Sequence, residues 1–360
     1  MQMYYLKWYN DIVGIIGDDF NVKFINPNLN KVVAIITDGK DSWDKKQLSE
    51  FLSDRIVSKD RRDIDKILFR LSMSDYDVIK IAVKTSAINP RDMLWIAKDK
   101  DDKMIDALGG SFENIFKQSI NSEGVTNSSP DGQNIKEYYI ADNSYGIKKQ
   151  RLHGLSTDAE NEVVVYNLGA LLGVRVCKAW MLPDNSVFSK YEYDFTKEYL
   201  VHARAYFKDG ERTGELYKDL IKKFPQFKTD IQRMILLDFI TRQDDRHLSN
   251  FAICEAADTS YFYSLYDNGR SLFHSESEKF IFDSVADIEA YSTSFGEIGT
   301  YYDAVNDIMK DTDIRNLINL NITNKQAYSI IKGSGITDYR LDGPTEWICK
   351  SIEYLRRKST

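Results

Sequence analysis

The polar segment Asp245–Asn250 lies between apolar stretches, and this arrangement restricts the local fold more than any other feature of the chain. Before it, residues 231–240 are mostly apolar and of helical character, and from Met234 onward only Asp238 interrupts the apolar run. After it, residues 251–254 have the composition of a short buried strand, and residues 261–266 that of a second strand beyond a polar turn. The pattern predicts a helix, a polar loop and a hairpin, in that order.

The polar residues of this region supply the groups of a phosphoryl-transfer site. Such a site needs an acceptor for the proton of the attacking hydroxyl and oxygen ligands for Mg²⁺. In kinase loops the base Asp precedes a metal-binding Asn by five positions, and a second metal-binding Asp opens an Asp-x-Gly turn. Asp245, Asn250 and Asp267 reproduce this order, and Gly269 is expected to let the backbone turn behind Asp267. The alternative interpretation is that Asp245 and Asp267 are solvent-exposed acids in loops.

A cation for the phosphates is expected on a strand before the loop. Residues 145–148, Tyr-Gly-Ile-Lys, resemble a kinase strand in which a small residue and a Lys share one face. Lys148 is the candidate phosphate contact, with Gly146 leaving room for adenine, and Lys149 is expected to point the other way. A solvent-facing lysine in a basic strand is the alternative.

An acidic partner for Lys148 is expected on the helix that follows. Thr157 and Glu160 have capping-box spacing, and the apolar periodicity predicts a helix that ends near Gly173. Because the cap would occupy Glu160, Glu162 is the better candidate for the ion pair with Lys148. The alternative for Glu162 is a surface position on an amphipathic helix.

The loop Asp-Arg-His-x-x-Asn and the later Asp turn resemble those of the HipA-like serine/threonine kinases of bacteria. A similar loop occurs in the phosphatidylinositol-3/4-kinase families, and both groups have a kinase-like fold. The resemblance covers residues 130–275 best. It implies that Asp245 is the base, that His247 and Asn250 contact nucleotide or metal, and that Asp267 binds metal. ATP and Mg²⁺ are the cofactors that it implies.

Two features depart from familiar protein kinases: a G-x-G-x-x-G loop is missing, and His follows the catalytic Asp. Residues 121–133 form a polar loop that is expected either to cover the phosphates or to be a plain connection. HipA-like kinases autophosphorylate in the corresponding loop, so the resemblance makes Ser122, Ser128 and Ser129 candidate acceptors.

The resemblance predicts an α+β chain with a two-lobed protein-kinase-like fold and a small mixed accessory region at the N-terminus. The expected regions are residues 1–105 for the accessory region, 106–204 for the small lobe and 205–360 for the mainly helical large lobe. The accessory region shows strand-like starts at residues 3–9 and 32–36 and helix-like segments at 47–52 and 64–71. Residues 198–203 have the alternation of a strand, where a kinase hinge is expected.

Composition agrees with a cytoplasmic enzyme. There is no long transmembrane run, and residues 1–10 lack the apolar core of a signal peptide. Cys177, Cys254 and Cys349 are too scattered for a disulfide framework or a zinc site. The formal charge of −7 disfavours general nucleic-acid binding.

The leading hypothesis is an ATP- and Mg²⁺-dependent serine/threonine protein kinase whose substrate is a protein with a Ser or Thr acceptor. The resemblance also permits an antitoxin-like partner. A phosphoinositide or small-molecule kinase remains open, because the catalytic loop does not encode its acceptor. A nucleotide-binding pseudokinase remains the alternative without turnover.

Overall fold

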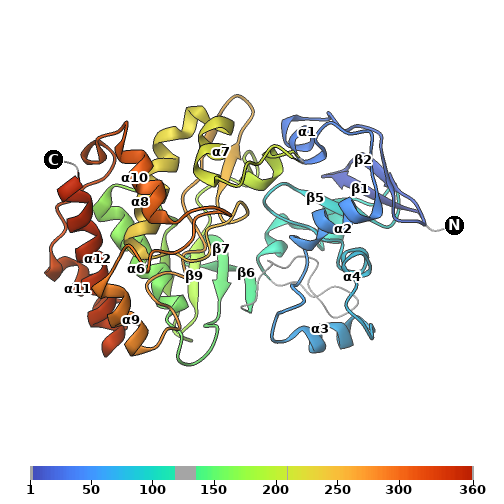
Figure 1. Cartoon of the computed structure of the whole chain (residues 1–360). Helices are drawn as coiled ribbons and strands as arrows, with labels where there is room; N and C mark the ends of the chain where they lie inside the picture. The colour runs from blue at the N-terminus through green and yellow to red at the C-terminus, as the bar shows by residue number, and fades with distance from the viewer. Residues whose placement is uncertain (1–2, 118–134, 209, 359–360) are drawn as a thin grey trace. The chain divides into compact units, whose positions relative to one another are not determined.

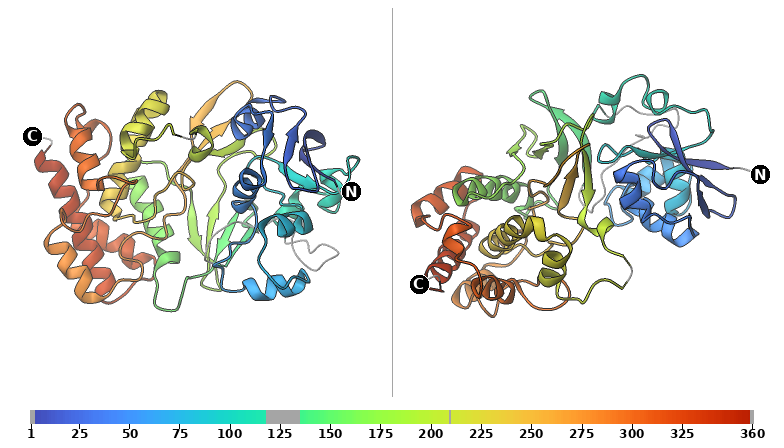
Figure 2. Two further views of the ribbon diagram at one scale, coloured as in Figure 1. Left: turned by 45° about the vertical axis from the view of Figure 1, so that its right-hand side comes forward. Right: turned by 90° about the horizontal axis from the view of Figure 1, so that it is seen from above.

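The chain folds into two compact units of mixed helix and strand (Figures 1 and 2). The computed structural model describes residues 3–117, 135–208 and 210–358. Among these, no helix is long and apolar enough to cross a membrane. The first unit consists of Met1–Leu152, Tyr193–Val201 and Cys254–Thr259, and the second of His153–Glu192, His202–Ile253 and Ser260–Thr360. The expected division at residues 105 and 204 stays a prediction.

An antiparallel sheet in the order β4-β3-β2-β1-β5 organises the first unit. Alternating residues such as Leu6, Val13 and Val22 point from the strands into its core, where they are almost fully buried. The strands are β1 Tyr4–Trp8, β2 Asp11–Ile16, β3 Val22–Phe24, β4 Ser42–Trp43 and β5 Leu94–Ala97. The helices are α1 Lys31–Thr37, α2 Lys45–Ser53, α3 Ile64–Arg70, α4 Val78–Thr85 and α5 Met104–Ala107.

Helices α2 and α3 and strand β1 confirm the expectations for those segments, but the strand expected at residues 32–36 is wrong. These residues form helix α1. Asn30 caps the helix by accepting a hydrogen bond from the Val33 amide, and Val32 and Val33 are buried. The β-branched run favours a strand, but the cap and burial outweigh this preference.

A hairpin of β6 Lys136–Ala141 and β7 Ser144–Lys149 completes the first unit and confirms the strand expected at residues 145–148. Glu137 pairs with Lys148 in its register, and Tyr139 pairs with Gly146. The short helix η1, Phe112–Ile115, precedes this hairpin. Strands β10 Tyr199–His202 and β11 Ala252–Glu255 follow later in the chain and confirm the strands expected near residues 198–203 and 251–254.

Helix α8, Lys228–Thr241, is the central element of the second unit. From Ile231 to Thr241 every residue except Arg233 is buried, so the helix has no fully solvated face. It packs against α6, α7, α10 and α12, as Figure 1 shows. The helix expected at residues 231–240 is therefore confirmed, and its C-terminal end delivers the polar loop from inside the core.

Other elements of the second unit pack on these helices, and α11 and α12 lie side by side at the C-terminal end (Figures 1 and 2). Its helices are α6 Asp158–Leu172, α7 Leu216–Lys223, α9 Glu278–Ala286, α10 Tyr301–Met309, α11 Asn324–Gly333 and α12 Tyr339–Lys358. Its remaining elements are β8 Ala179–Met181, β9 Val187–Lys190, β12 Ser260–Phe262, η2 Ala203–Tyr206, η3 Pro225–Phe227 and η4 Ile314–Asn316.

Helix α6 ends at Gly173 in the left-handed conformation, as expected, but its start differs from the prediction. The Thr157 side chain makes no capping bond to the helix. Its hydroxyl and its backbone amide both donate to the His274 carbonyl oxygen, at 3.4 and 2.8 Å. The predicted capping box is wrong, because a long-range partner takes the Thr157 hydroxyl.

The strand expected at residues 261–266 is shorter than predicted, since β12 ends at Phe262. The chain beyond it is held by a parallel bridge between Val176 and Leu265. The Leu265 amide donates to the Arg175 carbonyl, and the Cys177 amide donates to the Leu265 carbonyl. This bridge positions the segment that leads to Asp267.

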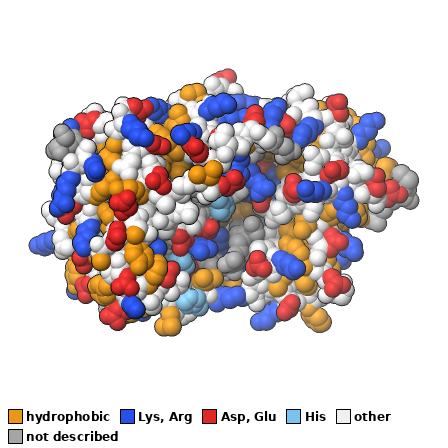
Figure 3. Space-filling view, in the orientation of Figure 1, with side chains coloured by type: hydrophobic (Ala, Val, Ile, Leu, Met, Phe, Trp, Pro, Cys, Tyr) orange, Lys and Arg blue, Asp and Glu red, His pale blue; other side chains and the backbone are white. Residues whose placement is uncertain are grey.

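The surface in Figure 3 carries Lys and Arg side chains interspersed with Asp and Glu side chains. Neither sign of charge gathers into one broad patch among the residues coloured on that face.

Candidate active site

The loop that follows α8 is compact because its own backbone closes two tight turns. Arg242 ends the helix in the left-handed conformation, with φ of 49°. The His247 amide then donates to the Asp245 carbonyl at 3.1 Å, and the Asn250 amide donates to the His247 carbonyl at 2.8 Å. The Asn250 side chain returns to the start of the loop, where its Nδ2 donates to the Asp245 carbonyl at 2.6 Å. The expected base and the expected amide ligand therefore belong to one ordered turn.

Asp267 lies in a strained turn, with a left-handed φ of 57°. Residues other than glycine rarely adopt this conformation, and where they do the surrounding structure must hold them. The amide of the next residue, Asn268, donates to Glu162 Oε2 at 3.0 Å. Asn161 Nδ2 donates to the carbonyls of Gly269 and Ser271. The start of α6 thus anchors the turn through two buried side chains.

Gly269 has a different role from the one expected. Asp267, and not Gly269, takes the left-handed conformation. A Cβ atom at Gly269 would lie 2.9 Å from the Asp158 carbonyl oxygen, closer than real Cβ atoms approach backbone. Glycine is needed here because the turn passes against the first residue of α6.

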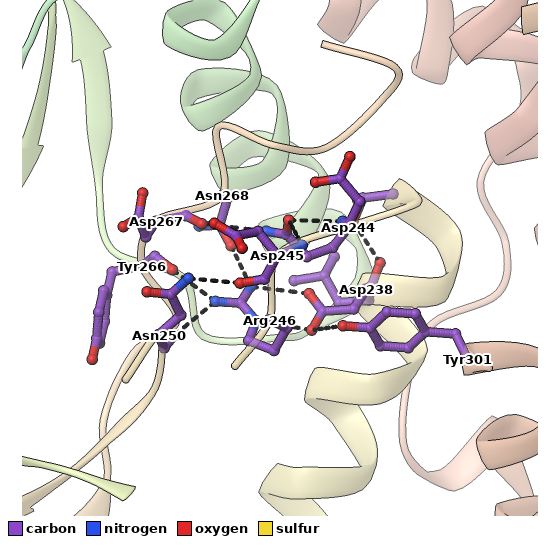
Figure 4. Close-up of polar contacts among 12 residues, drawn as sticks. Asp238, Asp244, Asp245, Arg246, Asn250, Tyr266, Asp267, Asn268 and Tyr301 are labelled. Carbon is purple, nitrogen blue, oxygen red and sulfur yellow. Dashed lines mark hydrogen bonds and ion pairs between the residues drawn. The ribbon is translucent and has the colours of Figure 1, made fainter. Parts of the chain in front are cut away.

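Arg246 joins the loop, the turn and helix α8 (Figure 4). Its side chain is fully buried and forms a two-bond fork with Asp238 of α8, at 2.9 and 3.0 Å. It also donates to the carbonyls of Asn250 and Tyr266 and to Asn268 Oδ1, at 2.8, 2.7 and 2.7 Å. The Asp238 carboxylate raises the pKa of Arg246 in spite of its burial. The Arg246 guanidinium thus links the loop that contains Asn250 to the turn that contains Asp267, although the two are separate in sequence.

Asn250 and Asp267 fit the oxygen ligands that Mg²⁺ requires. Because Asn250 Nδ2 is bonded to the Asp245 carbonyl, Oδ1 is the end of the amide that faces away from it and can bind a cation. Asp267 contributes a half-buried carboxylate from the adjoining turn. One carboxylate and one amide, with phosphate oxygens and water, suffice for an octahedral site.

Asp245 is half-buried, and its environment suits a base. Burial raises the pKa of its carboxyl above the ordinary 3.8, and the nearby carboxylates of Asp267 and Asp244 raise it further. Arg270 and His247 lower the pKa of Asp245 and oppose this shift. The Asp267 charge thus acts on the Asp245 carboxyl.

The remaining predicted residues are His247, Glu162 and Lys148. His247 is exposed, and its Nδ1 accepts the Ser249 amide at 3.2 Å. Glu162 is buried. Lys148 belongs to the first unit, where its Nζ lies 3.4 Å from Glu137 and 5.0 Å from the centre of the Tyr139 ring. The predicted pair of Lys148 with Glu162 would join the two units, and it stays a prediction.

The loop expected at residues 121–133 lies outside the described residues, together with the candidate acceptors Ser122, Ser128 and Ser129. Their roles stay predictions.

Three residues of the site were missed in the sequence. Asp238 pairs with Arg246, Tyr301 donates its hydroxyl to Asp238 Oδ2 at 3.2 Å, and Gln243 contacts both the loop and Asp267. Asp238 carries a signal in the sequence, since a single acid inside an apolar run must find a partner when buried. Tyr301, 63 positions from Asp238, carries none.

The comparison with one solved structure agrees with this architecture. No protein-family model matches the chain, and no curated protein matches its sequence. A kinase described as proinflammatory, CtkA of Helicobacter pylori, matches with a TM-score of 0.46 at 15% identity, over 62% of this chain and 90% of that one. HipA of Shewanella oneidensis, solved as a toxin–antitoxin complex with HipB and operator DNA, matches with a TM-score of 0.54 at 12% identity, over 98% of this chain and 99% of that one. The chain therefore has the fold of HipA, as the resemblance of its catalytic loop predicted.

Proposed function

We propose that the chain is an ATP- and Mg²⁺-dependent serine/threonine protein kinase of HipA-like type. The observation that carries the proposal is the convergence of Asp245, Asn250 and Asp267 around Arg246. Buried bonds tie the loop and the turn to each other, which supports a shared site for the proposed base Asp245 and the proposed ligands Asn250 and Asp267. The HipA fold supports the same function.

Each residue has a defined task in this proposal. Mg²⁺, when bound, neutralises phosphate charge while the γ-phosphoryl group of ATP is transferred. Asp245 orients the acceptor hydroxyl and accepts its proton as the new oxygen–phosphorus bond forms and the bond to ADP breaks. Asn250 and Asp267 hold the metal. Lys148 binds phosphate oxygens with Glu162 restraining it, and His247 contacts the nucleotide.

The acceptor is a Ser or Thr of a protein, and self-phosphorylation in the segment 121–133 is part of the proposal. The HipA structure contains the antitoxin HipB, and this supports an antitoxin-like partner for the present chain. The proposed place of action is the cytoplasm.

The test is incubation of the purified chain with labelled ATP and Mg²⁺, beside Asp245→Ala and Asp267→Ala, with mass spectrometry of the phosphorylated residues. Each variant should lose transfer by at least about a hundred-fold, the lower range for a general base or an electrostatic group. Asp258→Ala is the matched control, because Asp258 is an exposed acid in the turn between β11 and β12. A folded Asp267→Ala protein with unchanged transfer would contradict the metal assignment.

Product analysis decides between the remaining alternatives. Label in protein supports the proposal, whereas label only in lipid or metabolite indicates another acceptor. Magnesium-dependent ATP binding by wild type without any product would indicate a pseudokinase.

A further inference from the structure

Gln243 is a fully buried amide that lies two residues before Asp245. A buried amide is costly unless its oxygen and its nitrogen both find partners. Its Oε1 accepts the backbone amides of Asp244 and Asp245, at 3.0 and 3.1 Å. Its Nε2 donates to the Asp267 carbonyl at 3.3 Å. The oxygen of the Gln243 amide therefore contacts the backbone of Asp244 and Asp245, and its nitrogen contacts the backbone of Asp267.

The Gln243 backbone is itself anchored, which makes the side chain a fixed spacer. Its amide donates to the Asp238 carbonyl at 2.9 Å, one turn back in α8. Its carbonyl accepts the Thr293 hydroxyl at 2.5 Å. Helix α8 and the loop that contains Thr293 thus hold the Gln243 backbone, from which the side-chain amide extends.

The site requires such a spacer for two physical reasons. Asp267 occupies a left-handed conformation that persists only where neighbouring groups hold it. Asp245 and Asp267 are also acids close enough for each to disfavour the charge of the other. Bonds to their backbones hold the two residues in place while both side chains carry negative charge.

We propose that Gln243 is a positioning residue for phosphoryl transfer, and that its amide sets the separation between Asp245 and Asp267. The inference rests on the proposed function. It assigns to Gln243 a chemistry that neither an apolar residue nor an ionised acid supplies, because the position needs an acceptor and a donor at once.

The variant Gln243→Glu tests this requirement with almost no change of shape. When protonated, the introduced carboxyl accepts from the two amides and donates to the Asp267 carbonyl, as glutamine does. When ionised, it only accepts, and its charge faces the Asp267 carbonyl oxygen. The ratio of variant to wild-type activity should therefore approach one at low pH and fall as pH rises.

The position of this transition follows from the surroundings. Burial raises the pKa of the introduced carboxyl, whereas the two backbone amides that donate to it lower the pKa. The charged groups that surround the neighbouring Asp245 are Asp244 and Asp267, which raise a carboxyl pKa, and Arg270 and His247, which lower it.

The assay is transfer from ATP between pH 5 and 9, with Mg²⁺ titrated at each pH. At the alkaline end, Gln243→Glu should lose roughly ten- to a hundred-fold in kcat or in apparent Mg²⁺ affinity, the range for groups that orient metal ligands. Gln326→Glu is the matched control. Gln326 is exposed in the capping box of α11, where Glu serves equally well, so its ratio should stay near one throughout.

Two results would overturn the inference. One is a Gln243→Glu ratio that stays near one with an unchanged Mg²⁺ requirement, and the other is a loss that does not depend on pH. If Gln243→Glu does not fold, Gln243→Asn replaces it, because an amide one methylene shorter cannot span both partners. Gln243→Asn should then lose activity at every pH, and full activity would refute the spacer. Absence of transfer by wild type would overturn the proposed function as well, whereas an active wild type with a flat ratio removes only the role of Gln243.

Discussion

Replacing Arg246 by methionine should destabilise the second unit by about 4 kcal/mol. The Arg246 and Asp238 side chains are 0% and 1% exposed, so the substitution leaves a buried carboxylate whose remaining bond comes from Tyr301. Breaking a buried ion pair from one side costs about 3–5 kcal/mol. Asn250, Tyr266 and Asn268 also lose their donor, although water that enters the vacated space can replace part of these bonds.

Differential scanning calorimetry and urea unfolding measure this loss. For a unit of roughly 150–250 residues, each kcal/mol lowers Tm by about 2–4 °C, so a fall of about 8–16 °C is expected. Arg315→Met is the matched control, because Arg315 makes a similar fork with Asp313 but on the surface, where the two side chains are 59% and 39% exposed. Solvent screens that pair, and its loss should leave Tm nearly unchanged.

The double variant Asp238→Leu/Arg246→Met separates stability from function. Removing both charges takes away the unpaired carboxylate, so part of the lost stability should return. Phosphoryl transfer should not return, because Asn250 and the Asp267 turn still lack their common donor. A fall in Tm below about 3 °C for Arg246→Met, with transfer intact, would refute the role of Arg246 as the buried link.

Two further substitutions test the electrostatics and the packing of the site. Asp245→Asn should abolish transfer and yet stabilise the protein at neutral pH, because the folded-state pKa of Asp245 is raised and its ionisation therefore opposes folding. In urea unfolding, the extra stability of Asp245→Asn over wild type should vanish as pH falls toward 3.8. Extra stability that persists at that pH would contradict the assignment of the effect to Asp245 ionisation. Gly269→Ala should cost about 1–3 kcal/mol and lower transfer, because its Cβ would lie 2.9 Å from the Asp158 carbonyl. Gly333→Ala, at a helical position with open space around it, should be neutral or stabilising, and equal losses in the two variants would refute the steric argument.

Several features of the fold were predictable because short-range patterns determine them. Helix α8 follows from its apolar run, and α6 ends where Gly173 permits a left-handed turn. The same local reasoning failed for α1, where a β-branched run favours a strand but the Asn30 cap and the burial of its valines decide the outcome. Local preference is weaker than a good cap combined with core packing.

The sequence by itself determined which groups the candidate site contains, since the order of Asp245, Asn250 and Asp267 already indicated phosphoryl transfer. Only the tertiary structure decided what holds them. Arg246 could as well have been a surface ion pair, and nothing in the sequence connects Gln243 to the Asp267 carbonyl. The reason is physical: spacing along the chain reports residue types and local conformation, whereas a buried hydrogen bond depends on which distant segments pack against each other. The residues proposed to carry the chemistry could therefore be identified from the sequence, whereas those proposed to position them could be identified only from the folded chain.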